Sequence, residues 1–132
     1  MPASGIDEQV RRFLATHVSS IEQLEVLLLL RANEGREWSA EECSRELRSD
    51  RRWIEERLGD LAARGFLVAH EIEAVLKYRY APTPSDARAL VDAVAKAYKE
   101  RRHGVINLIY GKIESDAVSF SDAFAFIKKK GG

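Results

Sequence analysis

A chain of 132 residues with 45% hydrophobic residues is sized for one compact domain with an ordinary core. Its single cysteine excludes an internal disulfide, and no run of about 18 uncharged apolar residues is present to span a bilayer. The first residues also lack the basic and apolar regions of a secretory signal, so we expect a cytoplasmic protein with no membrane partner.

Charge is balanced over the whole chain but not along it. The 21 basic and 21 acidic residues cancel, so no overall field draws the chain toward nucleic acid or an anionic membrane. Residues 37–80 carry eight basic and ten acidic residues, a net charge of −2, whereas residues 96–132 carry eight basic and four acidic residues, a net charge of +4. The cations therefore gather in the last quarter.

Two helices are predicted near the N-terminus. Between Ile6 and Val18 the apolar residues recur at helical spacing. The second helix, over about residues 21–32, contains the run VLLLL and is apolar enough to be buried on most sides. Gly35 is expected to end it.

A short extended link at Glu37 and Trp38 leads into the next helix. Ser39 and Glu42 form an S-x-x-E capping box, in which the serine bonds forward and the glutamate bonds back across the first turn. Cys43 lies on the apolar stripe of this helix and is predicted to be a core residue. Trp38 is predicted to be in the core as well.

A second capped helix follows directly. Ser49 is its expected N-cap, and Ile54, Leu58 and Leu61 recur at intervals of four and three residues on its buried face. Gly65 is expected to terminate it.

Beyond this helix the apolar period changes from 3.6 to 2, which predicts a hairpin. In the returning strand, apolar residues that face inward alternate with outward cations: Leu76, Tyr78 and Tyr80 against Lys77 and Arg79. Residues 66–71 are the expected antiparallel partner, and Pro82 and Pro84 close the hairpin. The connecting residues IEAV contain no glycine or asparagine, so they do not specify a turn type.

A long helix is predicted from its cap at Ser85 onward. Gly104 lies inside it and costs roughly 1 kcal/mol relative to alanine, which favours a kink or a close helix contact there. A last amphipathic segment carries Phe120, Phe124 and Ile127 before a run of three lysines.

This order of elements resembles a winged helix-turn-helix domain, a mainly α fold with a small β-hairpin. The residues that carry the resemblance are the extended link at Glu37–Ser39, the positioning helix SAEECSREL, the recognition helix SDRRWIEERLGDLAARGFL and the returning strand KYRYAPT. Five of them follow a pattern common in such domains: Leu58, Leu61, Gly65, Phe66 and Leu67.

The resemblance covers residues 20–84, flanked by an N-terminal helix in residues 1–19 and by a long helix and basic tail in residues 85–132, as in MarR-like transcriptional regulators. The tail also looks like that of small uncharacterised bacterial winged-helix proteins. The resemblance implies a bacterial transcriptional regulator that binds double-stranded DNA. It also implies a homodimer, because the terminal helices of MarR-like proteins build a two-fold interface.

In such a complex the second helix of the pair enters the major groove and cations around it contact phosphates. The positions at the groove would be Arg51, Arg52, Trp53 and Glu56, with Lys77 and Arg79 on the flanking DNA backbone. The outward face of the helix, however, is expected to carry one cation, Arg52, and three anions: Glu55, Glu56 and Asp60. Several carboxylates pressed against a phosphate-lined groove repel it.

The alternative is a winged-helix module that binds another protein and has little or no DNA affinity. The acidic helix and the acidic hairpin tip, with Glu71 and Glu73, favour it. Trp53 lies at a flank of the buried stripe, where it either packs under a neighbouring helix or remains exposed as an aromatic anchor for a partner.

Nothing in the sequence assembles into an active site. His17, His70 and His103 are isolated and are not spaced as helical metal ligands. No glycine-rich phosphate-binding loop is present. We therefore expect no enzymatic activity, no metal and no cofactor.

Overall fold

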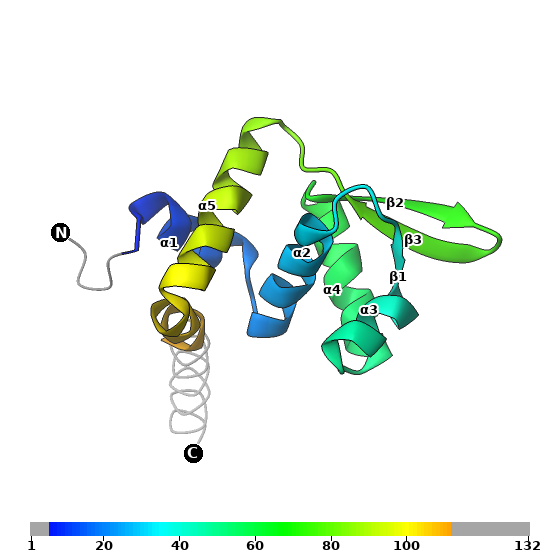
Figure 1. The fold of residues 1–132 in the computed structure, drawn as a ribbon, viewed down its shortest axis with the longest axis horizontal. Helices are drawn as coiled ribbons and strands as arrows, with labels where there is room; N and C mark the ends of the chain where they lie inside the picture. The colour runs from blue at the N-terminus through cyan, green and yellow to red at the C-terminus, as the bar shows by residue number, and fades with distance from the viewer. Residues whose placement is uncertain (1–5, 112–132) are drawn as a thin grey trace, which may run out of the picture.

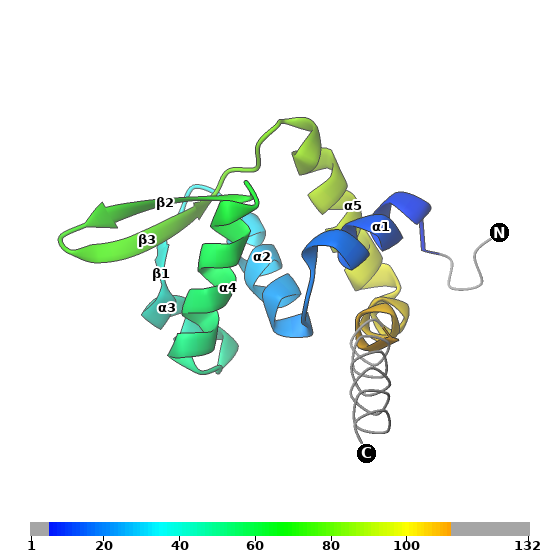
Figure 2. The same ribbon diagram turned by 180° about the vertical axis from the view of Figure 1, so that it is seen from behind.

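The computed structural model describes residues 6–111. Its elements in chain order are α1 (Glu8–His17), α2 (Ile21–Ala32), β1 (Trp38–Ser39), α3 (Ala40–Leu47), α4 (Arg51–Ala63), β2 (Leu67–Ile72), β3 (Val75–Tyr80) and α5 (Asp86–Glu100). Residues 102–111 are helical as well. Both ribbon views place α1 and α5 at one end, the β2–β3 hairpin at the other, and α2 to α4 between them (Figures 1 and 2). The predicted fold class is confirmed.

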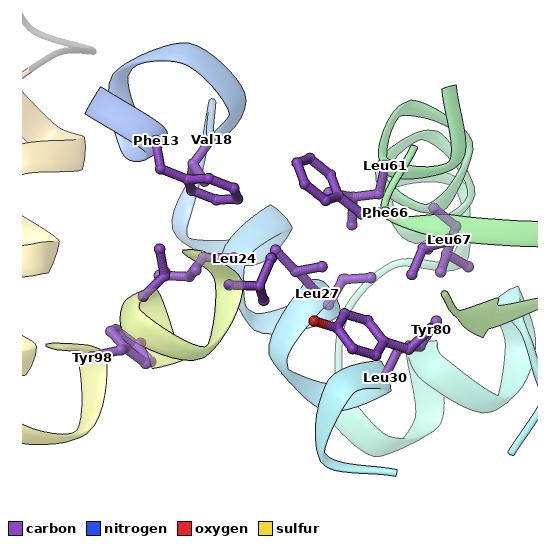
Figure 3. Packing of buried hydrophobic residues seen from close by; sticks show 14 of the residues in the cluster. Phe13, Val18, Leu24, Leu27, Leu30, Leu61, Phe66, Leu67, Tyr80 and Tyr98 are labelled. Carbon is purple, nitrogen blue, oxygen red and sulfur yellow. The ribbon is translucent and has the colours of Figure 1, made fainter. Parts of the chain in front are cut away.

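The core is centred on α2. Leu24, Leu27 and Leu30 are each 0% exposed, and Figure 3 shows them between Tyr98 of α5 on one side and Tyr80 of β3 on the other. Full burial of each such leucine stabilises the fold by about 1.5–3 kcal/mol. The expectation that this helix is buried on most sides is therefore confirmed, and the helix joins the two ends of the molecule.

The start of α3 has the predicted capping box. Ser39 Oγ accepts a hydrogen bond from the backbone N–H of Glu42 at 3.1 Å, and the Glu42 carboxylate accepts one from the backbone N–H of Ser39 at 3.0 Å. The bond from the Ser39 backbone N–H is the largest cause that lowers the pKa of the Glu42 carboxyl group. Cys43 and Trp38 are in the core, as predicted.

The N-cap of α4 is Asp50 and not Ser49. The Asp50 carboxylate accepts from the backbone N–H of Arg52 at 2.8 Å. The Ser49 hydroxyl instead donates to the carboxylate of Glu22 on α2. The prediction of Ser49 was wrong because this contact, between residues far apart in sequence, competes with the local cap.

Gly65 ends α4 in a Schellman motif, as the sequence predicts. The N–H of Phe66 donates to the carbonyl of Leu61, and the N–H of Gly65 donates to that of Ala62. Gly65 has φ +90°, and a Cβ there would lie 3.0 Å from the Thr83 carbonyl oxygen. Both observations require glycine at this position.

The three strands form one antiparallel sheet in the order β1-β3-β2. Trp38 pairs with Tyr78, and Leu67 pairs with Tyr80. The two tyrosines are buried, as predicted, but Leu76 is 51% exposed. Leu76 lies on the same face as the two tyrosines, but it is next to the turn and lines an open groove with Arg51 and Glu55 of α4, so the prediction that it is a core residue was wrong.

The turn of the hairpin is unusual for its residues. Ile72 pairs with Val75 across Glu73 and Ala74, whose φ angles are +51° and +66°. Two consecutive positive φ angles indicate a type I′ turn, which favours Asn-Gly. We expect Ala74→Gly to raise the free energy of unfolding by about 0.5–1 kcal/mol, since it relieves the left-handed strain of alanine. Urea unfolding measures the change, and a loss of stability would contradict it.

The long C-terminal helix of the sequence prediction is interrupted. α5 ends at Glu100, Arg101 leaves the helix with φ −130°, and the chain is helical again over residues 102–111. The break lies three residues before Gly104 and not at the glycine. Ser85 is at the N-cap position of α5, as predicted, but its side chain makes no capping bond.

The predicted apolar stripe of the N-terminal helix is confirmed by the burial of Val10, Phe13 and Leu14 in α1. Among the residues that the structure describes, no single helix is long and apolar enough to cross a membrane. Only α1 and α2 taken together would have the length and composition, and they meet at a bend of 110°.

Candidate nucleic-acid interface

α4 presents one face to the core and the opposite face to solvent. Ile54, Leu58 and Leu61 are each 0% exposed, as the apolar spacing predicts. The helical repeat places Arg52, Glu56, Gly59 and Ala63 at the centre of the opposite face, and all four are exposed. Arg51 and Glu55 lie on the flank toward the hairpin, where they line a groove of ≈ 310 Å³ with Val75, Leu76 and Tyr78.

The predicted site residues fall into two groups that the structure does not bring together. Arg51, Arg52, Trp53 and Glu56 are all exposed in the first half of α4. Lys77 and Arg79 are half-buried on β3, and strand alternation turns them away from Tyr78, which lines the groove next to α4.

Most of the candidate cations have a carboxylate of their own. Arg51 lies 3.8 Å from Glu55, Arg52 lies 3.6 Å from Asp50, and Lys77 lies 3.6 Å from Glu42. Arg79 has no carboxylate within 4 Å among residues 6–111. The arginine pairs are well exposed, and such pairs contribute at most about 1 kcal/mol, so a DNA phosphate can replace either carboxylate at little cost.

Asp60 is not on the outward face, contrary to the sequence prediction. Its carboxylate accepts from Arg64 Nε at 2.9 Å and from the side-chain amide of Gln23 on α2. Asp60 is therefore turned toward α2, and its charge is offset by Arg64. The exposed first half of α4 then carries two arginines and two glutamates, a less acidic surface than the sequence projection implied.

Trp53 is 53% exposed, which excludes the first of its two predicted placements, packing under a neighbouring helix. Its ring centroid lies 6.0 Å from Cζ of Arg57, which also pairs with Glu22 of α2 at 3.6 Å. The ring thus lies on the α2 flank of α4, on the other side from Arg51. Its exposure leaves the second reading, an aromatic contact for a partner, as the one compatible with the structure.

Gly59 leaves the centre of the outward face without a side chain. A Cβ at this position would meet nothing within 4 Å, so no packing requires glycine, although glycine costs about 1 kcal/mol in a helix interior. We expect Gly59→Ala to raise the free energy of unfolding by about 0.5–1 kcal/mol, as measured by urea unfolding. If a ligand approaches this face closely, the same change lowers its affinity. Unchanged affinity would place the contact elsewhere.

Three polar contacts in this region join residues that are distant in sequence. The Gln23 amide on α2 bonds to Asp60, and Arg64 Nη1 donates to the Thr16 carbonyl at 3.0 Å. His70 Nε2 lies 2.6 Å from a Glu37 carboxylate oxygen, across β3. No local sequence signal points to these partners.

Metal-ligand side chains form no cluster within the described residues. No three His, Cys, Asp or Glu side chains among residues 6–111 are placed to hold a metal ion. Burial raises the pKa of the Cys43 thiol to about 12, so this thiol is not activated as a nucleophile. His103 is exposed on the helical residues 102–111.

Comparisons with known proteins were made at the level of both sequence and structure. No family model matches the sequence, and no curated protein matches it. Solved structures do match. Reduced HlyU from Vibrio cholerae aligns with a TM-score of 0.52 and 18% identity, over 67% of this chain and 88% of that one.

Two further solved structures cover more of the chain. A mutant of MepR from S. aureus, bound to an oligodeoxyribonucleotide, aligns with a TM-score of 0.55 and 10% identity over 89% of this chain and 88% of that one. A mutant of MarR from E. coli aligns with a TM-score of 0.53 and 12% identity over 94% and 85%. The chain has a MarR-like winged-helix fold. In the usual names for the parts of this fold, α3 is the positioning helix, α4 is the recognition helix and the β2–β3 hairpin is the wing.

Proposed function

We propose that the chain is a DNA-binding transcriptional regulator whose recognition helix α4 enters the major groove of double-stranded DNA. The observation that carries this proposal is the exposure of Arg51 and Arg52 at the N-terminal end of α4, in a winged helix. The solved neighbours are winged-helix transcriptional regulators, and one of them is bound to DNA. The neighbours are not enzymes, which agrees with a role in binding.

The position of the two arginines supports an anionic ligand. Cations in the first turn of a helix oppose the helix dipole at a cost of about 0.3–1 kcal/mol each. Asp50 and Glu55 offset this cost only through exposed pairs. A phosphate near the same end would interact favourably with both guanidinium groups and with the free N–H groups of the first turn.

We further propose a homodimer built by the terminal helices. The stripe of α1 is already buried within the chain, so a second copy would use the remaining apolar surface there. Tyr110 is 53% exposed, and Leu108 lines a groove of ≈ 380 Å³ beside α1. Sedimentation velocity of the full chain is expected to give at least the mass of a dimer, and a monomer at all concentrations would contradict this.

The test of DNA binding is fluorescence anisotropy of random duplex DNA titrated with the full chain at about 50 mM and 200 mM salt. Phosphate contacts predict a linear fall of log affinity with log salt, with a slope of about −0.9 for each phosphate neutralised. No binding at the lower salt concentration would overturn the proposal.

The second candidate is a protein-interaction module, and two observations favour it. Trp53 is exposed, and Glu56 on the outward face has no cation within 4 Å among residues 6–111. Tryptophan is enriched in interface hot spots. Such a contact predicts weak dependence on salt and a negative heat-capacity change on binding, measured by calorimetry with the partner.

A further inference from the structure

The wing carries more exposed apolar surface than any other element in the described part of the chain. Six large hydrophobic residues between residues 6 and 111 are exposed, and four of them lie on the wing: Val68, Ile72, Val75 and Leu76, at 41%, 38%, 45% and 51%. Val68, Ile72 and Val75 lie on one face of the hairpin, because Val68 and Ile72 are four residues apart on β2 and Ile72 pairs with Val75, whereas Leu76 pairs with Glu71 on the other face. A wing that only contacts phosphates has no need of the three side chains on the first face, and exposed apolar surface marks interaction sites.

β2 also has an open edge. It is the last strand of the β1-β3-β2 sheet, and both ribbon views show no described segment beside its outer edge (Figures 1 and 2). The Phe66 carbonyl accepts a hydrogen bond from the Ala81 N–H at 3.1 Å, so Phe66 and Ala81 form a hydrogen-bonded pair. In an antiparallel ladder, hydrogen-bonded and non-hydrogen-bonded pairs alternate along the strand. The even-numbered residues of β2 therefore bond to β3, and the N–H and C=O groups of Leu67, Ala69 and Glu71 point outward.

An antiparallel second copy of β2 satisfies these outward groups in several registers, and one of them brings the exposed apolar residues Val68 and Ile72 together. We propose that two copies of the chain associate through their wings, with β2 pairing with β2 about a two-fold axis at His70. In this register Val68 of each copy faces Ile72 of the other, which gives two apolar cross-strand pairs. These lie at non-hydrogen-bonded positions, where facing side chains are closest.

The charges agree with the same register. Glu71 of each copy faces Ala69 of the other, so no carboxylate faces a carboxylate. Each His70 keeps its own carboxylate, that of Glu37 at 2.6 Å, so a charge on either ring is offset within its own chain. A two-fold pairing is isologous and closes on itself, so it buries the open edge of both sheets at once. The result is a continuous six-stranded sheet.

The register makes one position diagnostic. Facing residues at non-hydrogen-bonded positions have Cα atoms about 4.5 Å apart. A disulfide requires a Cα separation of about 4.4–6.8 Å, so cysteines at residue 70 of two copies can be joined. A homodimer built by the terminal helices gives no reason for this contact, so the test does not depend on the proposed dimer or on DNA binding.

The experiment is disulfide formation in a glutathione redox buffer, measured by non-reducing electrophoresis of the full chain with His70→Cys. The matched control is Leu76→Cys, which places an exposed thiol on the same hairpin but away from the axis. Cys43 is 0% exposed and does not compete. We expect the His70→Cys chain to form roughly tenfold more covalent dimer than the control.

A second variant tests the apolar pairs. Adding Val68→Lys and Ile72→Lys to His70→Cys replaces both pairs by facing cations and is expected to lower the covalent dimer roughly tenfold. Both side chains are already partly exposed, and circular dichroism checks that the fold is kept. Equal cross-linking of His70→Cys and Leu76→Cys, or no effect of the two lysines, would overturn the proposal and indicate that another segment covers β2.

Discussion

Replacing Arg51 and Arg52 together by alanine is expected to weaken binding to duplex DNA by roughly 30-fold at about 50 mM salt. The estimate takes about 1 kcal/mol for each charged contact. It is also expected to make the slope of log affinity against log salt less steep by about 1.8, since each phosphate contact contributes about 0.9. Fluorescence anisotropy at several salt concentrations measures both quantities.

The matched control removes the same charge elsewhere. Lys96 and Lys99 on α5 are both exposed, and neither lines the groove beside Leu108 or lies on α3, α4 or the wing. The double variant Lys96→Ala/Lys99→Ala lowers the net charge by the same two units, so a long-range effect of charge alone would act on both proteins. Similar affinities for the two double variants would show that the N-terminal end of α4 is not at the phosphates.

The Arg51 and Arg52 variant also changes stability in a known direction. It removes two cations from the first turn of α4, where they oppose the helix dipole, and leaves the Asp50 cap intact. We therefore expect its free energy of unfolding to be equal to or slightly above that of the original chain. Lost DNA binding could then not be attributed to unfolding.

Local signals in the sequence were sufficient for most of the fold. The Ser39 and Glu42 capping box and the end of α4 at Gly65 depend on residues within five positions of one another, and both were predicted correctly. The alternation around Tyr78 identified the hairpin in the same way. Such features depend on residues that are close in sequence, so their spacing alone predicts them.

The errors share one physical cause, which is contact between residues distant in sequence. Ser49 does not cap α4 because its hydroxyl bonds to Glu22. Asp60 does not face outward because its carboxylate bonds to Gln23 and Arg64. The candidate site was affected most, because its net charge depends on which side chains are turned inward. The position of Lys77 relative to Arg51 also depends on how the sheet packs against α4, which short sequence patterns do not specify.

Replacing Asp60 by alanine is expected to lower the stability of the fold. Gln23 is 1% exposed, and its amide nitrogen donates to the Asp60 carboxylate, while its amide oxygen accepts from the Ser19 N–H at 2.8 Å. Asp60→Ala leaves the buried amide nitrogen without this partner, at a cost of about 1–3 kcal/mol. We expect the free energy of unfolding to fall by about 2 kcal/mol and Tm to fall by roughly 6–10 °C.

Asp92→Ala is the matched control for this prediction. Asp92 accepts from Arg31 Nε at 2.9 Å, the distance that Asp60 has to Arg64, but its side chain is 52% exposed and it bonds to no buried amide. Loss of an exposed pair costs at most about 1 kcal/mol. Asp60→Asn retains an oxygen for Gln23 and should recover part of the loss. Equal losses for Asp60→Ala and Asp92→Ala, measured by urea and thermal unfolding, would refute a special role of the Gln23 contact.

The same contact joins the recognition helix to the terminal helices. Asp60 positions Arg64, whose guanidinium also donates to the Thr16 carbonyl at the end of α1. The end of α4, the start of α2 and the end of α1 are thus held by one set of polar bonds. In a dimer built by the terminal helices, the spacing of two recognition helices must match about one turn of DNA. Asp60→Ala should therefore lower affinity for a two-site operator more than for a single site.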